Sequence, residues 1–502
     1  MLEWFSHSRR ERKRVSKPLI VQSSICSIAL ALIGTTILVA CGSGSSPASD
    51  PTSTLEETRA QDSRAFVADT TATTFAAMPE AVGDVTDMST TSRWAGVLDG
   101  AGYRIEVPAA WNGKLVMYTH GFAGNGSVLS VVNPSIRRYL IQNDYAWAAS
   151  SYSKNYYDVR AGIEDTNALA LQFTAIAAQN LRSLAAPAKI YITGHSMGGH
   201  IAAAAIEDET IATARNKVRY HGAVPMCGNV GDVELFNQFA AMQVAAQALA
   251  GIPNYPTAQW SDVSALVTDS LFLTFPSVPT ATGEKYLSVL KNLTGGTRPM
   301  FDLGIAFGGS FPSAYGTFSS DGTIAGILNN NVLDTEAFTY SIDGDIAGST
   351  ALNDSTQKLT AATDANRLRR DGLRWIPVIN GEFTTPVVSI HTLGDLFVPF
   401  SMEQIYRNRV TAKGNSAWLV QRAIRGVSHC DFTIAEQVSA FDDMIKWERD
   451  GIKPLGDDVT TPATVATATY GCRFTNNVLG PDESGTTNVL RPATLANSIP
   501  CP

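Results

Sequence analysis

The sequence predicts an α/β domain: a mostly parallel central sheet with helices on both faces, interrupted by a large, mainly helical insertion. Strand-like apolar runs alternate with amphipathic helical patterns in residues 94–231 and again in residues 382–452, and such alternation is typical of parallel sheets. The alternation stops in residues 232–381, where helical patches and Gly-rich loops follow one another. A Gly-rich turn at residues 194–198 joins an apolar strand to a helix, which fits the same architecture.

The composition is that of an ordinary globular protein. Of the 502 residues, 44% are hydrophobic and 17% are charged, which excludes an intrinsically disordered chain, a collagen-like repeat and a small disulfide scaffold. The length allows one large, elaborated domain or two to three modest ones. Because the formal net charge is −8, nucleic acid is not expected as a partner.

Residues 1–40 are predicted to be a lipoprotein signal peptide. A basic cluster between Arg9 and Lys17 precedes an apolar run of sixteen residues, and the sequence LVAC follows at residues 38–41. This ending resembles the lipobox of bacterial lipoproteins, in which the cysteine thiol is diacylated, and implies lipidation of Cys41. A membrane-spanning signal anchor is the alternative, although a span takes about 20 residues. The resemblance implies an exported protein, lipid-anchored in the bacterial cell envelope, at the outer membrane, in the periplasm or at the cell surface.

A flexible tether and the first part of the core follow the signal peptide. Residues 41–60 are rich in Gly, Ser, Pro and Thr, which predicts a tether. Residues 61–231 form the first part of the core, and β-rich runs between turns predict two antiparallel edge strands at its start. The further elements expected there are a strand at 114–118, a strand at 145–151, a helix at 159–184, a strand at 189–193, a helix at 198–215 and a strand at 220–225.

Residues 232–381 are predicted to be a cap or lid inserted into the core. Helical patterns cover 235–249, 261–271 and 283–290, a polar helix is expected near 356–371, and 307–318 is expected to be a loop. Aromatic side chains are frequent and charges are few, which is typical of an apolar acyl or aromatic pocket. The alternative is that most of these side chains form only the cap's own core. They are Phe236, Phe239, Trp260, Phe272, Phe275, Phe301, Phe307, Phe311, Tyr315 and Phe318.

The second part of the core is expected in residues 382–452, followed by a Thr/Pro-rich, disulfide-closed tail in residues 453–502. The core elements expected here are a strand at 386–391, a helix at 402–410, a strand at 418–424 and a helix at 433–447. Four cysteines lie beyond the signal peptide and the lipid site, and in an oxidising compartment they allow three disulfide pairings. They are Cys227, Cys430, Cys472 and Cys501. A metal site is not expected, because no CxxC pair or histidine cluster accompanies them.

Ser196 is the predicted nucleophile. It lies in the sequence GHSMG at residues 194–198, after an apolar strand and before a helix, which is the context of a nucleophile elbow. The serine sits there on a tight, strained turn, and at Gly194 and Gly198 a side chain would collide with the neighbouring strand and helix. The helix behind the serine provides free N–H groups and a partial positive charge where an oxyanion would form.

A serine hydroxyl needs a base, and the base needs an orienting acid. The elbow resembles that of the α/β-hydrolases, and this resemblance implies that the acid and then the histidine follow the serine along the chain. His429, in the sequence IRGVSHCDF, is the predicted base, and Asp395, after a strand and a glycine, is the predicted acid. His391 lies within a strand and is expected to be a packed core histidine. His195 and His200 flank the nucleophile and are expected to be structural or to line the pocket.

The predicted oxyanion hole takes one backbone N–H from Met197, directly after the nucleophile. The second donor is expected from the loop after an early strand. The sequence LVMYTHGFAGNG provides that loop, and Phe122 is the predicted donor.

At these residues the chain resembles the serine esterases of the α/β-hydrolase superfamily, and the resemblance covers about residues 94–450. It is carried by His120-Gly121-Phe122, the elbow at 194–198, Asp395 and His429, all in the order that the superfamily uses. It implies the α/β-hydrolase fold, a Ser-Asp-His triad and an acyl-enzyme mechanism without a metal or organic cofactor. The elbow is also similar to that of cutinase-like polyester hydrolases.

The pair His429-Cys430 is similar to the tannase and feruloyl esterase group, in which a cysteine after the histidine is disulfide-bonded to one before the serine. His195 occupies the position before Ser196 in this chain, so the resemblance implies a bond from elsewhere. Cys227 is the candidate partner of Cys430, which leaves Cys472 to pair with Cys501. The second bond closes a loop of about 30 residues and is worth roughly 3–4 kcal/mol on the chain-entropy account.

The implied reaction is hydrolysis of carboxylic esters through an acyl-enzyme on Ser196, in an enzyme of the esterase or lipase type. The substrate is expected to be a small-molecule or oligomeric ester, with polyester oligomers, aryl esters and acylglycerols all open. A serine peptidase of the same fold and a depolymerase of polyester or hydroxyalkanoate oligomers are the alternatives. A non-catalytic, surface-binding lipoprotein is a further alternative that would need no intact triad.

Overall fold

A computed structural model describes residues 65–69, 74–85, 88–318, 332–363, 365–369 and 371–501. The chain divides into two compact units, residues 1–50 and residues 51–502, and all of the described residues belong to the second. The predicted signal peptide, the lipid site at Cys41 and the tether lie outside the described residues. Within the described ranges, none of the helices combines the length and the apolar character needed to cross a membrane.

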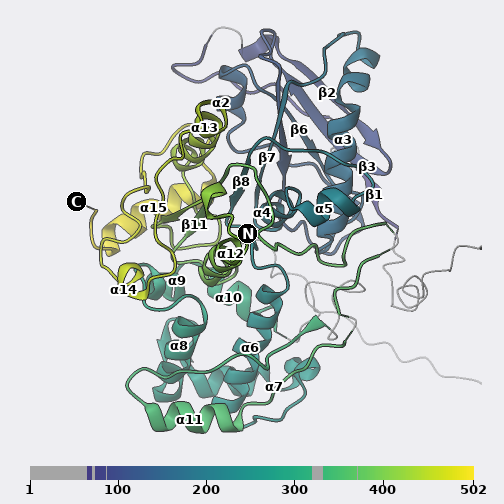
Figure 1. Cartoon of the computed structure of the whole chain (residues 1–502). Helices are drawn as coiled ribbons and strands as arrows, with labels where there is room; N and C mark the ends of the chain where they lie inside the picture. Colours follow the sequence, from purple (N-terminus) through teal and green to yellow (C-terminus); the bar gives the residue numbers. More distant parts are fainter. Residues whose placement is uncertain are drawn as a thin grey trace, which may run out of the picture. The chain divides into compact units, whose positions relative to one another are not determined.

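The central sheet has eight strands in the order β12-β11-β8-β7-β4-β6-β3-β2. The pairings from β6 through β4, β7, β8 and β11 to β12 are parallel, and β3 is antiparallel to both of its neighbours. This order, with one antiparallel strand near the edge, is that of the α/β-hydrolase fold, as predicted (Figure 1). The strands are β2 (Ser92–Leu98), β3 (Ala101–Val107), β4 (Lys114–Thr119), β6 (Ala146–Ser150), β7 (Lys189–His195), β8 (Ala223–Met226), β11 (Val387–Thr392) and β12 (Leu419–Ile424).

Both faces of the sheet are covered, because alternate residues of each strand point to opposite sides. In β4, Leu115 and Met117 join one hydrophobic core, and Val116 and Tyr118 join a second core. Helices that contribute to the first core are α3 (Val159–Gln179), α4 (Met197–Ala204) and α12 (Ser401–Ala412). Helices α2 (Arg137–Gln142) and α13 (Ile434–Asp450) pack on the other face (Figure 1).

The predicted helix at 198–215 is two helices, α4 and the short α5 (Asp208–Thr213). Glu207 separates them in an extended conformation. Its buried carboxylate accepts hydrogen bonds from the N–H groups of Gly381 and Glu382, at 3.0 and 2.8 Å. The chain therefore turns at this point in order to hold the end of the insertion.

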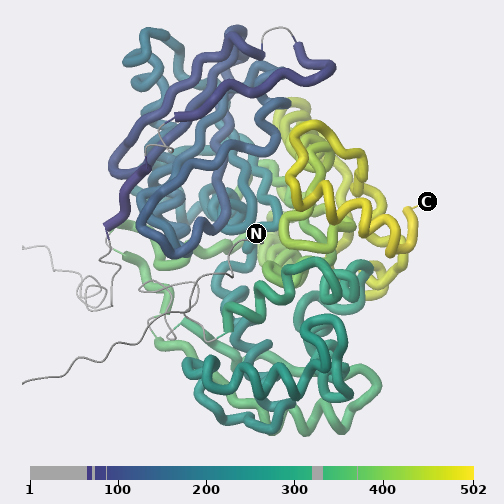
Figure 2. Tube along the Cα trace, turned by 180° about the vertical axis from the view of Figure 1, so that it is seen from behind, coloured from purple at the N-terminus to yellow at the C-terminus, as the bar shows by residue number. Residues whose placement is uncertain are grey.

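Residues 232–381 are called the cap segment below. Helices are the main regular structure of its described part, and Figure 2 shows most of these helices together at the bottom, in teal and green. The prediction of a helix near 356–371 is wrong. A helix, α11, precedes this range and ends at Ser355, and the N–H and C=O groups of Leu359 both form hydrogen bonds with Thr335. The expected loop at 307–318 contains a short helix. The elements are α6 (Glu234–Leu249), η2 (Thr257–Gln259), α7 (Trp260–Leu271), β9 (Phe272–Thr274), β10 (Val278–Pro279), α8 (Ala281–Leu293), α9 (Phe301–Ala306), α10 (Ser310–Tyr315) and α11 (Ile346–Ser355).

An ion pair with a buried carboxylate joins both ends of the cap segment to the core. The carboxylate of Asp232, at the start of the segment, accepts from Arg409 of α12 at 2.5 Å and from the N–H of Ile379 at 2.9 Å. Because Asp232 is fully buried, losing Arg409 would leave an unpaired internal charge, which is strongly unfavourable. The entry and exit of the cap segment are therefore fixed side by side.

The tail from residue 453 packs beside the second part of the core, as the yellow segment in Figure 2 shows. Arg425, which follows β12, donates to the carbonyl oxygens of Ala468, Tyr470 and Ile499. The tail is thus tied to the loop that follows the last strand. The remaining elements are β1 (Val67–Ala68), η1 (Met88–Thr90), β5 (Val128–Leu129), η4 (Ser416–Trp418), α14 (Pro462–Val465) and α15 (Gly485–Asn497).

Candidate active site

Ser196 lies at the carboxyl end of β7, in a backbone conformation that side chains rarely adopt, with φ 58° and ψ −121°. Close backbone packing explains the glycines on either side of it. A Cβ at Gly194 would lie 2.0 Å from the Thr119 hydroxyl, and a Cβ at Gly198 would lie 2.0 Å from the Thr119 carbonyl oxygen. Only glycine fits at both positions, so β4 and the start of α4 together fix the strained turn.

The structure brings the three residues predicted as a triad into one hydrogen-bonded chain. The Ser196 Oγ lies 2.8 Å from Nε2 of His429, and Nδ1 of His429 lies 2.6 Å from Oδ2 of Asp395. Since an ionised carboxylate only accepts, Nδ1 carries the hydrogen and Nε2 is free to accept from the serine hydroxyl. That tautomer is the one in which a histidine can remove a proton from serine.

Asp395 is held independently of the histidine. Its Oδ1 accepts from the N–H groups of Phe397 and Val398, at 2.9 and 3.1 Å. The carboxylate is fully buried, whereas Ser196 and His429 are partly exposed. The acid is therefore shielded from water, while the serine and the imidazole are open to a ligand.

The two predicted oxyanion donors, Phe122 and Met197, belong to segments that pass next to Ser196. Met197 begins α4, where the first N–H groups have no acceptor within the helix. The loop after β4 passes close to the nucleophile, since a Cβ at Gly121 would lie 3.2 Å from the Cβ of Ser196. Phe122 is the next residue of that loop, so both N–H groups belong to segments that adjoin the serine.

The histidines beside the nucleophile have other partners. Burial lowers the pKa of His195 to about 4, and its ring lies 3.2 Å from the Tyr118 hydroxyl and 3.1 Å from the Gln437 side-chain oxygen. Burial also lowers the pKa of His200 to about 4, and its ring contacts the Tyr157 hydroxyl and the Pro377 carbonyl oxygen. Both rings are neutral near pH 7, and each is engaged away from the Ser196 hydroxyl.

Two disulfide bonds are present, and they join Cys227 to Cys430 and Cys472 to Cys501. Cys430 follows His429 directly, and its sulfur lies 3.5 Å from Nε2 of that histidine. The first bond therefore fastens the histidine loop to the residue after β8. Both of its cysteines have positive φ, 43° and 58°, which is uncommon for a side chain with a Cβ.

Among the described residues, Cys227, His429 and Cys430 are the one group of His, Cys, Asp and Glu side chains close enough to share a metal ion, with ligand atoms within 4.8 Å of one another. Both sulfurs belong to the disulfide bond. They offer no thiolate, which is the form of cysteine that binds metals. These two cysteines therefore hold the loop of His429 in place through their disulfide bond and are not available as metal ligands.

A buried ion cluster joins the same loop to the tail, and no local sequence pattern predicts it. Arg491 of α15 is fully buried and donates to Glu436 of α13, with Nη2 2.7 Å from Oε2. The same nitrogen donates to the Asp431 carbonyl oxygen, two residues beyond His429. The carboxylate of Asp431 also lies close to this cation, with Oδ1 3.6 Å from Nε of Arg491.

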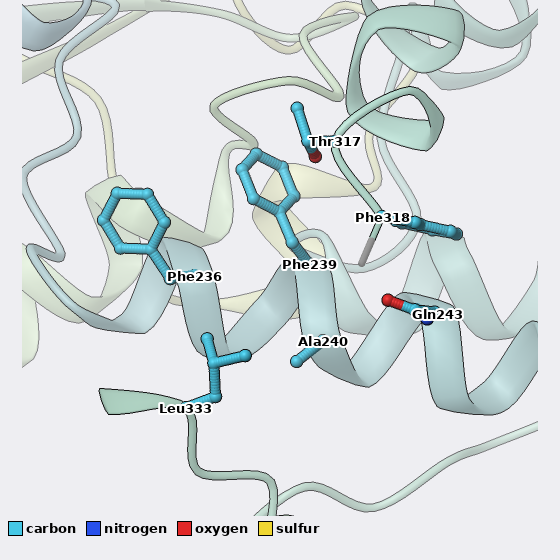
Figure 3. Close-up of a pocket in the computed structure, with 7 residues that line it drawn as sticks. All are labelled: Phe236, Phe239, Ala240, Gln243, Thr317, Phe318 and Leu333. Atoms are coloured by element: carbon cyan, nitrogen blue, oxygen red, sulfur yellow. The ribbon is translucent and has the colours of Figure 1, made fainter. Parts of the chain in front are cut away.

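A small aromatic pocket is lined entirely by residues of the cap segment. Rings of Phe236 and Phe239 on α6 form part of its wall (Figure 3). The ring centroid of Phe239 is 5.7 Å from that of Phe397, and Phe397 is 5.4 Å from the His429 ring. The pocket lining carries no formal charge. It consists of Phe236, Phe239, Ala240, Gln243, Thr317, Phe318 and Leu333.

Most other aromatic residues of the cap segment pack against one another. Trp260 contacts Tyr315 and Phe318, and Phe275 contacts Phe272 and Phe311. These rings form the core of the cap segment, which was the alternative considered for most of them. Phe318 belongs to both groups, since it also lines the pocket.

Comparison with known proteins gives a family match and structural similarity. Residues 111–234 match the family described as "Putative serine esterase (DUF676)", and this segment runs from the approach to β4 through Ser196 to the start of α6. No curated protein sequence is significantly similar to the chain.

The similar solved structures include feruloyl esterase B from Aspergillus oryzae, with 14% identity, a TM-score of 0.38 and coverage of 72% of this chain and 82% of that one. The rice cell wall degrading esterase LipA from Xanthomonas oryzae has 13% identity, a TM-score of 0.32 and coverage of 71% and 87%. The acylaminoacyl peptidase from Pyrococcus horikoshii has 9% identity, a TM-score of 0.35 and coverage of 74% and 43%.

Proposed function

We propose that this serine hydrolase of the α/β-hydrolase fold cleaves carboxylic esters through an acyl-enzyme on Ser196. The observation that carries the proposal is the continuous hydrogen-bonded chain from the Ser196 hydroxyl through His429 to Asp395, with distances of 2.8 and 2.6 Å. The strained conformation of the serine and the match to a serine esterase family over the same segment support it.

In the proposed reaction, Nε2 of His429 takes the proton of the Ser196 hydroxyl as Oγ attacks the ester carbonyl carbon. The N–H groups of Phe122 and Met197 stabilise the negative oxygen of the tetrahedral intermediate. Asp395 keeps the hydrogen on Nδ1 and stabilises the imidazolium. The imidazolium then gives its proton to the departing alkoxide, and a water molecule activated by the same histidine releases the acid and restores the serine. These steps need neither a metal ion nor an organic cofactor.

The uncharged aromatic pocket supports an apolar acyl or aryl group as part of the substrate. One of its rings, Phe239, contacts Phe397, and Phe397 in turn contacts the His429 ring. A charged group placed there would lose its hydration without gaining a partner. We therefore favour esters of apolar acids or phenols, with oligomers of apolar hydroxy acids as the second choice.

We also propose that the enzyme works outside the cytoplasm. Two disulfide bonds are more typical of exported proteins than of cytoplasmic ones. The resemblance of residues 38–41 to a lipobox supports a lipid anchor at Cys41. Substrates would then reach the enzyme from the envelope or from the surroundings of the cell.

The test is hydrolysis of a series of p-nitrophenyl acyl esters, from acetate to palmitate, by the purified full chain and by Ser196→Ala. A matched control is Ser261→Ala, which removes the hydroxyl of an exposed serine at the start of α7. We expect Ser196→Ala to lose at least about 1,000-fold in kcat/KM while keeping its circular dichroism spectrum. Equal rates in the wild type and Ser196→Ala would overturn the assignment of the nucleophile. Faster cleavage of peptide p-nitroanilides than of every ester would replace the esterase by a peptidase.

A further inference from the structure

His391 is a fully buried histidine at the end of β11 that the proposed reaction does not use. Its Nε2 donates to the carbonyl oxygen of Val398, at 2.7 Å. The N–H of Val398 in turn donates to Oδ1 of Asp395. His391 therefore fixes the position of Val398, whose N–H in turn fixes the carboxylate of Asp395, the predicted orienting acid.

The same nitrogen of His391 also faces the acid itself. Nε2 lies 3.8 Å from Oδ2 of Asp395, which is the oxygen that accepts from His429. At that distance there is no hydrogen bond, but a charge on one group acts strongly on the other, because neither is exposed to water.

On its other side, His391 faces a second buried carboxylate. Nδ1 lies 3.5 Å from Oε1 of Glu403 and has no hydrogen-bond partner among the described residues. Glu403 is fixed by the Ser389 hydroxyl at 2.6 Å and by the Gln421 side-chain nitrogen at 2.5 Å. The order across the core is therefore Glu403, His391, Asp395, His429, Ser196.

The charges of this cluster balance only when His391 is protonated. Two carboxylates, Asp395 and Glu403, lie on either side of the ring, and Arg298 of the cap segment is the other buried cation near Asp395. The Arg298 guanidinium donates hydrogen bonds to the carbonyl oxygens of Leu393 and Gly296 and to the Thr294 hydroxyl, and not to either carboxylate. The further titratable groups around the cluster are Tyr406 and Arg407 on α12, Tyr470 of the tail and His429.

The electrostatic environment agrees with a protonated ring. Burial alone lowers the pKa of His391, but Glu403, the charge of Asp395 and the bond to the Val398 carbonyl together outweigh burial and raise it. An unpaired carboxylate in the same place would be strongly unfavourable, because buried charges need a partner of opposite sign.

We propose that His391 is a positioning residue whose imidazolium, held between Glu403 and Asp395, balances the charge of Asp395 and so sets the pH range in which His429 acts as a base. The inference rests on the proposed function. With the positive charge present, Asp395 stabilises a second imidazolium at His429 less strongly. Without it, Asp395 favours protonation of His429, and the enzyme loses its base at a higher pH.

The test is the pH dependence of kcat/KM for p-nitrophenyl ester hydrolysis by His391→Gln. Glutamine places an amide nitrogen near the position of Nε2, so it keeps a donor for the Val398 carbonyl but carries no charge. We expect the midpoint of the acid limb to rise by about 0.5 to 1 pH unit. Glu403→Gln removes the group that keeps His391 protonated, so the acid limb should rise in the same direction. His221→Gln, at a half-exposed histidine outside the site, is the control and should leave the profile unchanged.

An acid limb that stays in place in both His391→Gln and Glu403→Gln would overturn the proposal and leave His391 with a purely structural role. If His391→Gln does not fold, two measurements remain that test the proposal. They are the pH profile of Glu403→Gln and the ¹⁵N chemical shifts of the histidine rings in the wild type. A neutral His391 ring at pH 7 would also overturn the proposal. Failure of the proposed function is distinct, because it would show as unchanged activity of Ser196→Ala.

Discussion

The two halves of the candidate active site are held in place in different ways. The nucleophile half is fixed by contacts of main-chain atoms, in which Gly194 and Gly198 lie against Thr119 of the neighbouring strand. The histidine half is fixed by side chains that come from far along the chain. These include the disulfide bond from Cys227, with a sequence separation of 203, and the ion pair from Arg491 of the tail.

This contrast explains which of the two kinds of support can be recognised from a local sequence pattern. A turn built from backbone packing must contain glycine at fixed spacings, so it leaves a motif. A loop that is held by remote side chains needs only one arginine or cysteine at each contact, and such residues carry no pattern. The nucleophile half should therefore fail abruptly when a single methyl group is added, and the histidine half should fail in graded steps.

The largest effect is expected from Gly198→Ala. The new Cβ would lie 2.0 Å from the Thr119 carbonyl oxygen and 2.5 Å from its carbon, so α4 and β4 would have to separate. Overpacking a core costs about 1–3 kcal/mol even where side chains can adjust, and here the obstacle is backbone. We expect ester hydrolysis to fall at least about 100-fold, with a lower melting temperature. Gly126→Ala, where nothing lies within 4 Å of the new Cβ, should behave like the wild type, and equal losses in the two variants would contradict the steric account.

The next effect is expected from the double substitution Cys227→Ala and Cys430→Ala. Removing a disulfide bond of this span costs about 2–5 kcal/mol, and here it also frees the residue beside His429. We therefore expect kcat to fall by about 10-fold or more, in addition to the loss in stability. The matched variant is Cys472→Ala with Cys501→Ala, in the tail, which should lower the urea midpoint and leave kcat within about 2-fold. A larger loss of kcat in the tail variant would show that the tail, rather than the first bond, controls the histidine.

Most of the sheet and the three proposed catalytic side chains were predictable because each has a local signal. Ser196 lies in a glycine pattern, and Asp395 and His429 each follow a strand in the expected order. The helix expected near 356–371 was wrong, since the pairing of Leu359 with Thr335 is a contact between segments that no local pattern encodes. Arg298 and Glu403 were not recognised for the same reason. Each is a single charged residue, and only the fold shows that it is buried beside Asp395.

Arg491→Met should have an intermediate effect. It leaves Glu436 and Asp431 buried without their cation, and breaking one side of a buried ion pair costs about 3–5 kcal/mol. Because burial already raises the pKa of both carboxyl groups while Arg491 counteracts it, the variant should recover part of its stability at acidic pH, where the carboxyl groups become protonated. Urea unfolding at pH 5 and pH 7.5 measures this. The free energy of unfolding that the variant loses relative to the wild type should be smaller at pH 5 than at pH 7.5. A larger loss at pH 5 would contradict the assigned ion cluster.

The smallest effect is expected from Phe239→Ala, which tests whether the aromatic pocket contacts the substrate. The ring lies between the pocket and Phe397, so its removal should weaken the binding of long or aromatic acyl groups by about 1–2 kcal/mol in the transition state. We expect kcat/KM for p-nitrophenyl octanoate to fall about 10-fold, while the value for the acetate changes by about 2-fold at most. Leu273→Ala, at an exposed side chain of β9, is the control within the cap segment. A uniform decrease across the acyl series would mean that Phe239 supports the fold of the cap segment, as its aromatic neighbours do, and the apolar group of the ester would have to bind elsewhere.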